Sequence, residues 1–231
     1  MKRFEGVTIG GVLSQTGQQL GPAEFVRCHF QGAILTPPPP DRPDLRARIM
    51  GMRLVDCSET GEALDAAILE DVVVDGLQTS DLLQFWSCAF RHVVFRGKVG
   101  RVMFSPIVSL LSDDPEVNAL WARKNDEFYS GCDWALDISE GQFQECEIQG
   151  IPAKLIRRDL ETQVVVTRES VLSGKWRNVD LEGTHWGVSI EFMLQRGDAD
   201  VVLVAPKRDR KYKKLLEGLR RLRDAGIAEP D

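Results

Sequence analysis

Residues 23–35 read Ala-Glu-Phe-Val-Arg-Cys-His-Phe-Gln-Gly-Ala-Ile-Leu, and this stretch decides the expected fold. A small residue recurs every five positions, and a large apolar residue follows each one two places later. The small residues are Ala23, Cys28 and Ala33, and the large ones are Phe25, Phe30 and Leu35. Because residues two apart on an extended segment point the same way, both members of a pair can face an interior. The three residues between pairs then turn a corner and face water.

The same pairing returns in three later blocks, which start at Ala47, Ala67 and Cys88. The steps between block starts are therefore 24, 20 and 21 residues. Twenty residues make four units of five, which predicts one square coil with four short sides. Stacked coils bury their apolar faces against each other, as in solenoid proteins. The predicted first interior column is Ala23, Ala47, Ala67 and Cys88, and the second is Phe25, Ile49, Leu69 and Phe90.

Two of the steps depart from twenty, and each departure has a local explanation. The first interval contains Pro37–Pro40, and a proline run cannot join a sheet ladder, so it predicts a loop at a corner. The third step exceeds twenty by one residue. A single-residue bulge between Thr79 and Ser87 would absorb that excess.

This pattern resembles the pentapeptide-repeat family, whose units read roughly Ala-(Asp/Asn)-Leu-x-x. The resemblance covers about residues 4–104, resumes at 141–151, and is faint at 179–183. Positions that are usually Asp or Asn in that family are occupied here by Glu24, His29, Ile34, Arg48 and Ala89, so the chain would be a degenerate member. The resemblance implies a right-handed quadrilateral β-helix. Some proteins of that family look like B-form DNA in size and charge and bind type II topoisomerases. The alternative fold is an unrelated all-β or α+β domain with short strands.

The predicted β-helix domain spans residues 1–206, with regular coils at 4–104 and a helical insert at 112–131. Asp113-Asp114-Pro115-Glu116 is typical of a helix start, and Trp121 is expected to anchor that helix by packing. Residues 132–206 are expected to form irregular coils or a capping sheet, with strands at 164–166, 188–194 and 201–204.

Residues 207–231 are predicted to be a basic amphipathic helix and tail, with the helix at 207–224. Its apolar stripe is Leu215, Leu216, Leu219 and Leu222. The stripe would cap the last coil, since solenoids need their open ends covered. Two alternatives are a homodimer contact through this helix, and an acidic or nucleic-acid partner bound on its basic face.

Charge is distributed unevenly along the chain. The net charge is −6, yet residues 207–224 hold nine Lys or Arg against three Asp or Glu. Residues 56–81 hold eight acidic residues and no Lys or Arg. Such patterns bear on partners and solubility, not on fold. Five cysteines with no CxxC pair, and no apolar run near the roughly 20 residues of a membrane span, predict a reduced cytoplasmic protein.

The sequence predicts no catalytic, cofactor-binding or metal-binding residues. His29, His92 and His185 lack metal-ligand spacing, and no GxSxG, P-loop or GxGxxG motif occurs. Neighbouring Cys28 and His29 would point to opposite faces of a strand, so they do not form a dyad. Four cysteines, Cys28, Cys57, Cys88 and Cys146, occupy small inward positions and are expected to fill the core.

The preferred functional hypothesis is a non-catalytic interaction scaffold with an unknown protein partner and no membrane contact, in one form a DNA mimic that binds a topoisomerase. The basic residues 91–101 interrupt the acidic stretch and weigh against that form. Partner-binding candidates are Glu70, Asp71, Asp75, Lys211, Lys214, Arg220 and Arg221. One alternative is a nucleic-acid or anionic-surface binder that uses the C-terminal helix, although the acidic body makes nucleic acid unlikely. Another is an enzyme or small-ligand binder near the helical insert, bounded by Trp121, Trp134, Trp176 or Trp186.

Overall fold

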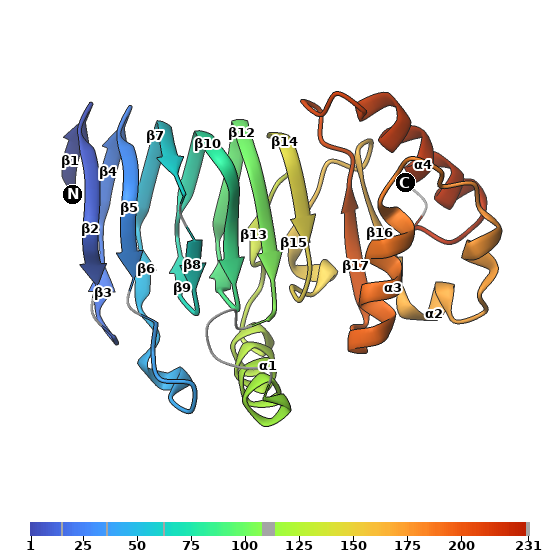
Figure 1. Ribbon diagram of the computed structural model, residues 1–231, viewed down its shortest axis with the longest axis horizontal. Coiled ribbons are helices and arrows are strands. Elements are labelled where there is room, and N and C mark those ends of the chain that lie inside the picture. The colour runs from blue at the N-terminus through green and yellow to red at the C-terminus, as the bar shows by residue number, and fades with distance from the viewer. Residues whose placement is uncertain (15, 36, 62, 108–113, 230–231) are drawn as a thin grey trace.

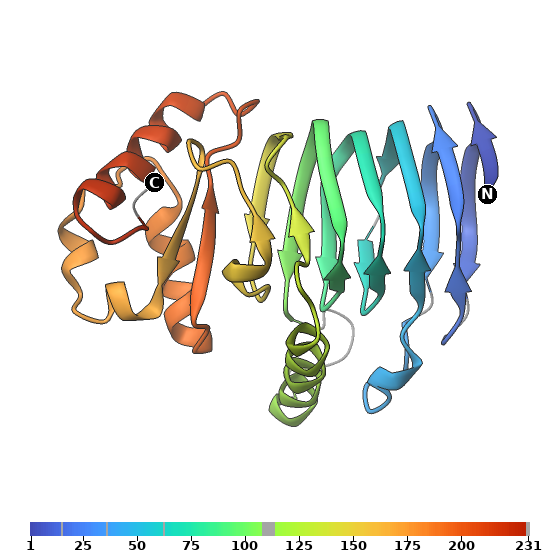
Figure 2. The same cartoon turned by 180° about the vertical axis from the view of Figure 1, so that it is seen from behind.

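The computed structural model describes residues 1–14, 16–35, 37–61, 63–107 and 114–229, with no side-chain description for residues 12–14 and 34. Within these ranges the chain is mainly β-stranded and carries a few short helices. The strands lie side by side along the long axis, and the C-terminal helices cover one end (Figure 1). The same order is seen from behind, where helix α1 (Pro115–Ser130) again stands out from one edge of the strands (Figure 2).

Two parallel sheets account for the strands of the described chain. The larger sheet contains β1 (Lys2–Glu5), β2 (Thr8–Ser14), β4 (Ala23–Val26), β5 (His29–Leu35), β7 (Met52–Thr60), β8 (Ala63–Asp65), β10 (Val73–Trp86), β12 (Val93–Ser105), β13 (Leu136–Asp137), β14 (Gly141–Ile148), β15 (Ile156–Arg157), β16 (Gln163–Thr167) and β17 (Asp200–Val204). The smaller sheet contains β3 (Gln19–Leu20), β6 (Arg48–Met50), β9 (Ile68–Glu70) and β11 (Ala89–Arg91). The remaining helices are η1 (Pro43–Leu45), η2 (Ala153–Leu155), α2 (Arg168–Val171), η3 (Lys175–Asn178), α3 (Trp186–Arg196) and α4 (Tyr212–Asp224).

The register of the strands repeats with nearly constant offsets. In the smaller sheet Leu20 lies opposite Ile49, Ile49 opposite Leu69, and Leu69 opposite Phe90, which gives offsets of 29, 20 and 21 residues. In the larger sheet Phe25 lies opposite Leu54, Leu54 opposite Val74, and Val74 opposite Phe95, with the same three offsets. The chain therefore returns to the same place in both sheets after about twenty residues.

The predicted interior columns are confirmed in three of their four members. The ladder joins Ala47 to Ala67 and Ala67 to Cys88, because the residues that follow them are paired. The placement of Ala23 and Phe25 in those columns is wrong: Ala23 lies opposite Met52, one five-residue unit further on. The reason is the segment between β5 and β6. It adds nine residues to a step of twenty instead of four, since it contains the turn η1 as well as the proline run.

The predicted bulge is confirmed within its interval. Thr79 pairs with Glu59, an offset of 20 residues, whereas Gln84 pairs with Ala63, an offset of 21. The extra residue therefore lies between Thr79 and Gln84 on β10. This placement brings the strands back into step before the next ladder begins at Ala67.

Left-handed backbone turns separate the strands at matching positions. One series of residues with φ between 51° and 80° is Gly6, Arg27, Asp56, Gly76 and Gly97. Its spacings of 21, 29, 20 and 21 residues equal the strand offsets, so the turns align as the strands do. A Cβ atom on Gly76 would lie 2.9 Å from the Asp56 carboxylate below it, which explains why glycine takes over at this level.

The helical insert is confirmed, with α1 inside the predicted range. The side chain of Asp114 caps its N-terminus by accepting a hydrogen bond from the Glu116 N–H at 2.9 Å. The predicted cap position 113 lies outside the described residues. Trp121 is fully buried, and its Nε1 donates to the Pro40 carbonyl at 2.8 Å, so it anchors the helix to the proline-containing segment.

Strand pairing resumes after the insert, which the sequence left open. Strand β13 pairs in parallel with both β12 and β15, and β14 pairs with β12. Strands β16 and β17 then pair antiparallel, and β17 continues the larger sheet from β14. The predicted strands at 164–166 and 201–204 are thereby confirmed.

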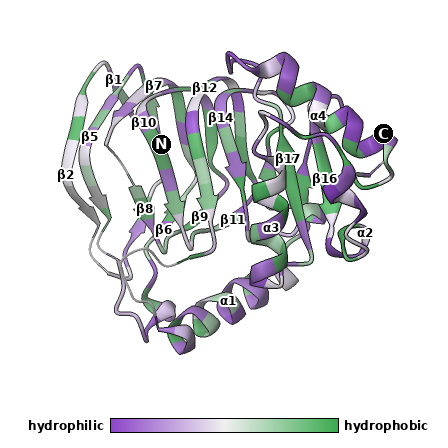
Figure 3. Ribbon diagram, turned by 45° about the vertical axis from the view of Figure 1, so that its right-hand side comes forward, coloured by the Kyte–Doolittle hydropathy of each residue, from purple (hydrophilic) through white to green (hydrophobic). Residues whose placement is uncertain are grey.

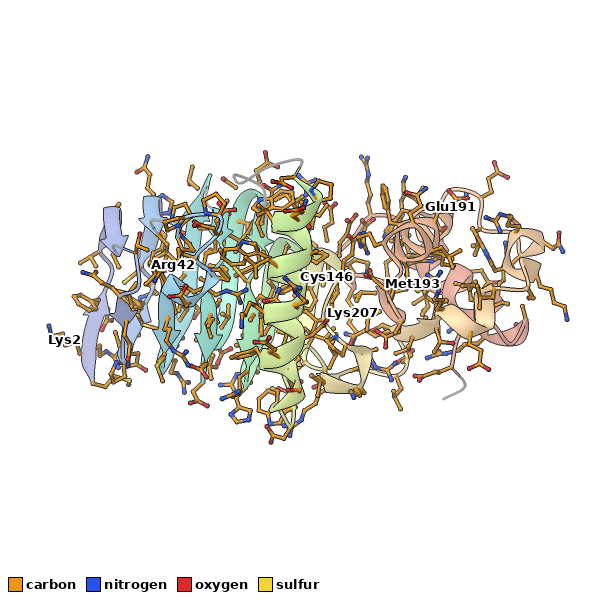
Figure 4. The ribbon with its side chains drawn as sticks, turned by 90° about the horizontal axis from the view of Figure 1, so that it is seen from below. Lys2, Arg42, Cys146, Glu191, Met193 and Lys207 are labelled. Atoms are coloured by element: carbon orange, nitrogen blue, oxygen red, sulfur yellow. The ribbon has the colours of Figure 1, made fainter. Side chains whose placement is uncertain are left out.

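The strand predicted at 188–194 is wrong, because this segment is helix α3. Trp186, Ile190 and Met193 are buried and lie on one helical face at spacings of four and three residues. Glu191 and Phe192 remain exposed on the other side. Figure 4 places Lys2 at one end of the molecule, with Glu191 and Met193 in the helical region toward the other end and α1 between them.

The C-terminal helix begins at Tyr212 instead of residue 207. Pro206 opens a turn in which Asp209 accepts a hydrogen bond from the Lys211 N–H, and α4 starts only after it. All four leucines of its apolar stripe are buried in a second core, against β16, β17 and α3. Hydrophobic and hydrophilic residues alternate along α4 in Figure 3. The stripe therefore covers the chain's own sheet, and a homodimer through it, as weighed from the sequence, would require α4 to leave this core.

Among the described residues, none of the helices combines the length and the apolar character needed to cross a bilayer.

Candidate interaction surfaces

Glu70, an expected partner-binding residue, is enclosed by its neighbours. It lies on β9 and is only 5% exposed. Arg48 on β6 and Arg91 on β11 approach it from either side, the latter with Nη1 3.3 Å from a carboxylate oxygen. A carboxylate that already binds two guanidinium groups is not available to a partner. The partner-binding prediction for Glu70 is therefore wrong.

Asp75 belongs to an alternating row of charges across the larger sheet. Its carboxylate binds Arg96 at 2.7 Å and lies 4.0 Å from Arg53. Arg53 in turn lies 3.6 Å from Glu24, which binds Arg3 at 3.0 Å. The hydrogen bond from Asp75 raises the pKa of Arg96. This face presents alternating charges instead of an acidic strip.

Asp71 takes part in a cluster that the sequence did not reveal. His92, in a left-handed turn, lies between two carboxylates, with Nδ1 3.1 Å from Asp71 and Nε2 2.7 Å from Asp133. The hydrogen bond with Asp133, followed by that with Asp71, raises the pKa of His92. The ring also packs on Trp134, at 4.7 Å between centroids, and Arg157 covers that tryptophan at 4.1 Å. Asp133 and Trp134 follow the insert by sequence, so only the fold brings them to His92.

Four of the eight acidic residues in the stretch 56–81 are thus paired with Arg or His. They are Glu70, Asp71, Asp75 and Asp81, the last with Arg101 at 3.2 Å. Arg101 also binds Glu145 at 2.6 Å. Glu62, another of the eight, lies outside the described residues. The stretch that appears acidic by sequence is interleaved in space with the basic residues that follow it.

Helix α4 shows the opposite arrangement. Arg210, Lys211, Lys213, Lys214 and Arg220 are exposed, and none of them forms an ion pair with an acidic residue of the described chain. This set is called the α4 basic face below. Three of its members were expected from the sequence, and the other two belong to the same run of cations.

Arg221, the fourth expected basic residue, is held by the chain itself. It pairs with Asp180 from the loop after η3 and lies 3.4 Å from Glu217 one turn earlier. The pairing contributes to the lowered pKa of Asp180. Arg221 therefore fixes α4 to the loop and is not part of the exposed set.

The tryptophans weighed as walls of an enzyme site are packing residues or lie at the surface. Trp121, Trp176 and Trp186 are at most 4% exposed, and Trp134 lies beneath Arg157. A small cavity of about 10 Å³ touches Trp186, which is room for about one water molecule. A much larger cavity lies elsewhere, between the two sheets.

This larger cavity corrects the expectation of a filled interior. Its volume is about 250 Å³, and its described lining is apolar except for the side chain of Glu59. The lining residues come from β2 and β3 at one end and from β12 at the other. The repeat pattern shows which side chains face inward, but it does not show whether their volumes fill the space.

The cysteines behave as buried core residues, as expected. All five are free, and only Cys132 is partly exposed. Burial raises the pKa of Cys88 to about 12, which keeps its thiol protonated and unreactive near neutral pH. Within the described residues, no group of three or more His, Cys, Asp or Glu side chains is arranged to hold a metal ion.

Comparison with known proteins gives no family for the chain. No model of a known protein family matches its sequence, and no curated protein matches it significantly.

Proposed function

We propose that the strands between residues 2 and 157 wind as a right-handed β-helix of the degenerate pentapeptide-repeat type. Its support is the shared set of offsets, 29, 20 and 21 residues, in both sheets and in the left-handed turns between strands. A chain that returns to the same two sheets at each pass, and turns at aligned positions, advances by one strand spacing per coil.

We further propose that the protein is a non-catalytic interaction protein that binds an acidic surface of another protein through the α4 basic face. One observation carries this proposal. The acidic residues tested as contacts are paired within the chain, whereas five cations on α4 and the turn before it are exposed and unpaired by the described acids. Uncompensated charge of one sign attracts partners of the other sign and speeds their association.

The support for this face is also mechanical. Leu215, Leu216, Leu219 and Leu222 hold α4 on the sheet, so the cations project from a fixed helix. Binding therefore does not first require the helix to become ordered, which would reduce affinity. The five unpaired thiols agree with a reducing compartment, and we propose the cytoplasm.

The test is binding to fluorescent poly-glutamate, measured by anisotropy at low salt. A triple variant, Lys211→Glu, Lys214→Glu and Arg220→Glu, is expected to bind at least about tenfold more weakly than the parent. The control reverses three exposed cations away from α4, Lys98→Glu, Arg123→Glu and Lys175→Glu, and thus makes the same change in net charge. The proposal fails if both variants lose affinity equally, since net charge alone would then explain the binding, or if the parent does not bind.

The run Arg210–Lys214 also favours a second candidate, a nucleic-acid or other phosphate-bearing partner. Phosphate binding weakens steeply with salt because counterions are released, by close to one power of salt concentration per phosphate contact. A short DNA or RNA duplex that gives no mobility shift at low salt would exclude this candidate. A topoisomerase partner is tested separately, and unchanged gyrase supercoiling in a large excess of this protein would exclude it.

A further inference from the structure

The cavity between the two sheets lies among the first strands of the chain. Its walls include Phe25 and Phe30 from early strands and Phe85 and Phe95 from later ones. The other described lining residues are Ile9, Leu20, Ala33, Leu35, Ile49, Met52, Leu54, Glu59, Leu64, Leu69, Val72, Val74, Leu77, Leu83 and Val93. Nearly all of these are aliphatic, so the cavity offers dispersion contacts and little hydrogen bonding.

One end of this cavity is closed by tightly packed rings. Phe85 stacks on Phe104 with centroids 5.0 Å apart, and Phe95 meets Phe104 edge-on at 5.7 Å. Phe90 adds a third contact to the same ring at 5.3 Å. All four side chains are at most 4% exposed. Beyond this cluster the interior is filled.

The other end is open toward the N-terminal strands. Phe25, Phe30 and Met52 face the interior but are only partly buried, whereas Phe95 further along is 1% exposed. Strands β1 and β3 are the outer strands of their sheets, and β2 pairs only with β5. Solvent therefore reaches inward-facing side chains from the end that β1, β2 and β3 form.

The cavity is long and narrow. Its lining runs from the level of β2 and β3 to that of β12, which is four strand spacings and hence roughly 19 Å. A volume of about 250 Å³ spread over that length leaves a slender channel. An apolar cavity of about 150 Å³ in another protein stays dry and binds benzene, so a cavity of this size and lining can bind a larger apolar group.

We propose that this channel binds the unbranched alkyl chain of an amphiphile, which enters from the β1–β3 end. A straight chain matches the narrow section, and its transfer from water releases about 0.8 kcal/mol per buried CH₂ group. Burying a charged head group beside the Glu59 carboxylate would be costly for an anion, so the head remains at the open end. There it meets the exposed side chains of Lys2, Arg3 and Arg27.

The experiment is isothermal titration of the purified chain with n-decanol, decanoate and decylamine in parallel. All three share the alkyl chain, and we expect them to compete for one site per chain. Decanoate is expected to bind more tightly than decylamine, because of the cations at the opening. Equal affinity for a compact apolar alcohol such as adamantanol would contradict a channel for straight chains.

Two variants locate the site. Leu54→Trp and Val74→Phe add volume to the lining, and each is expected to weaken n-decanol binding by at least about tenfold. The matched control is Gln78→Trp, an exposed position beside the lining residue Leu77, which is expected to change affinity by less than about twofold. Circular dichroism identifies a variant that fails to fold, and the second variant then decides.

Three results would overturn the proposal. The first is no binding heat with any of the three probes, and the second is unchanged affinity in a folded Leu54→Trp or Val74→Phe variant. The third is a concentration-dependent dimer that buries the β1–β3 end and is not dissociated by n-decanol, since a second copy of the chain would then close the channel.

Discussion

Replacing Phe104 with alanine should destabilise the protein far more than the same replacement at Phe25, although both residues face the interior. Phe104 is 1% exposed and touches three other phenylalanine rings. Phe25 lies in the open half, is partly buried, and lines the cavity. The comparison tests whether the interior is filled at one end and hollow at the other.

The magnitudes follow from burial and packing. Truncation of a buried phenylalanine typically costs about 3–5 kcal/mol, and loss of aromatic pairs adds to the upper part of that range. We therefore expect about 4–5 kcal/mol for Phe104→Ala. At Phe25 less apolar surface returns to water and the space beside it is already empty, so we expect about 1–2 kcal/mol.

Urea unfolding followed by tryptophan fluorescence measures both losses as changes in the unfolding free energy. A change in the slope of either transition would show an altered unfolded or native state, and hydrogen exchange would then replace the comparison. Equal losses, within about 0.5 kcal/mol, would refute the distinction between a filled and a hollow half.

Three further outcomes are expected. Glu24→Lys places a third cation between two arginines, so it should lower the unfolding free energy by up to about 1 kcal/mol while Glu24→Gln loses less; equal effects would show that the charge row contributes nothing. The hydrogen bond with Asp133 raises the pKa of His92, so its stabilisation is fully present below about pH 6.5 and is lost as pH rises through the folded-state pKa. The urea midpoints of the parent and His92→Gln should therefore differ at acidic pH and converge at alkaline pH, and a constant difference would contradict this. Iodoacetamide should label Cys132 first in the native chain, and equally fast labelling of all five thiols would contradict the burial of the other four.

The repeat predicted which side chains face inward, but not always which side of the fold they occupy. Ile49, Leu69 and Phe90 form a column because the steps between them are close to four whole units. Phe25 carries the same local pattern yet belongs to a different column. A five-residue pattern looks alike on every side of a coil, so an inserted loop of uncertain extent leaves the side undetermined.

Other features depended on the competition between local patterns. The segment that became α3 is rich in apolar residues and resembles a strand, but Trp186, Ile190 and Met193 at helical spacing decide its structure. The His92 cluster required Asp133 to be carried back across the insert. The cavity was beyond prediction because periodicity specifies direction, whereas filling depends on side-chain volumes across five levels of strands.

The most direct test of the proposed winding is a crystal structure in which the neighbours of Leu54 are identified. The account predicts Phe25 on one adjoining parallel strand and Val74 on the other, with Ile49, Leu69 and Phe90 aligned in the second sheet. If Leu54 instead had an antiparallel neighbour, or if Phe25 were aligned with Ile49, the proposed register and the β-helix built on it would be contradicted.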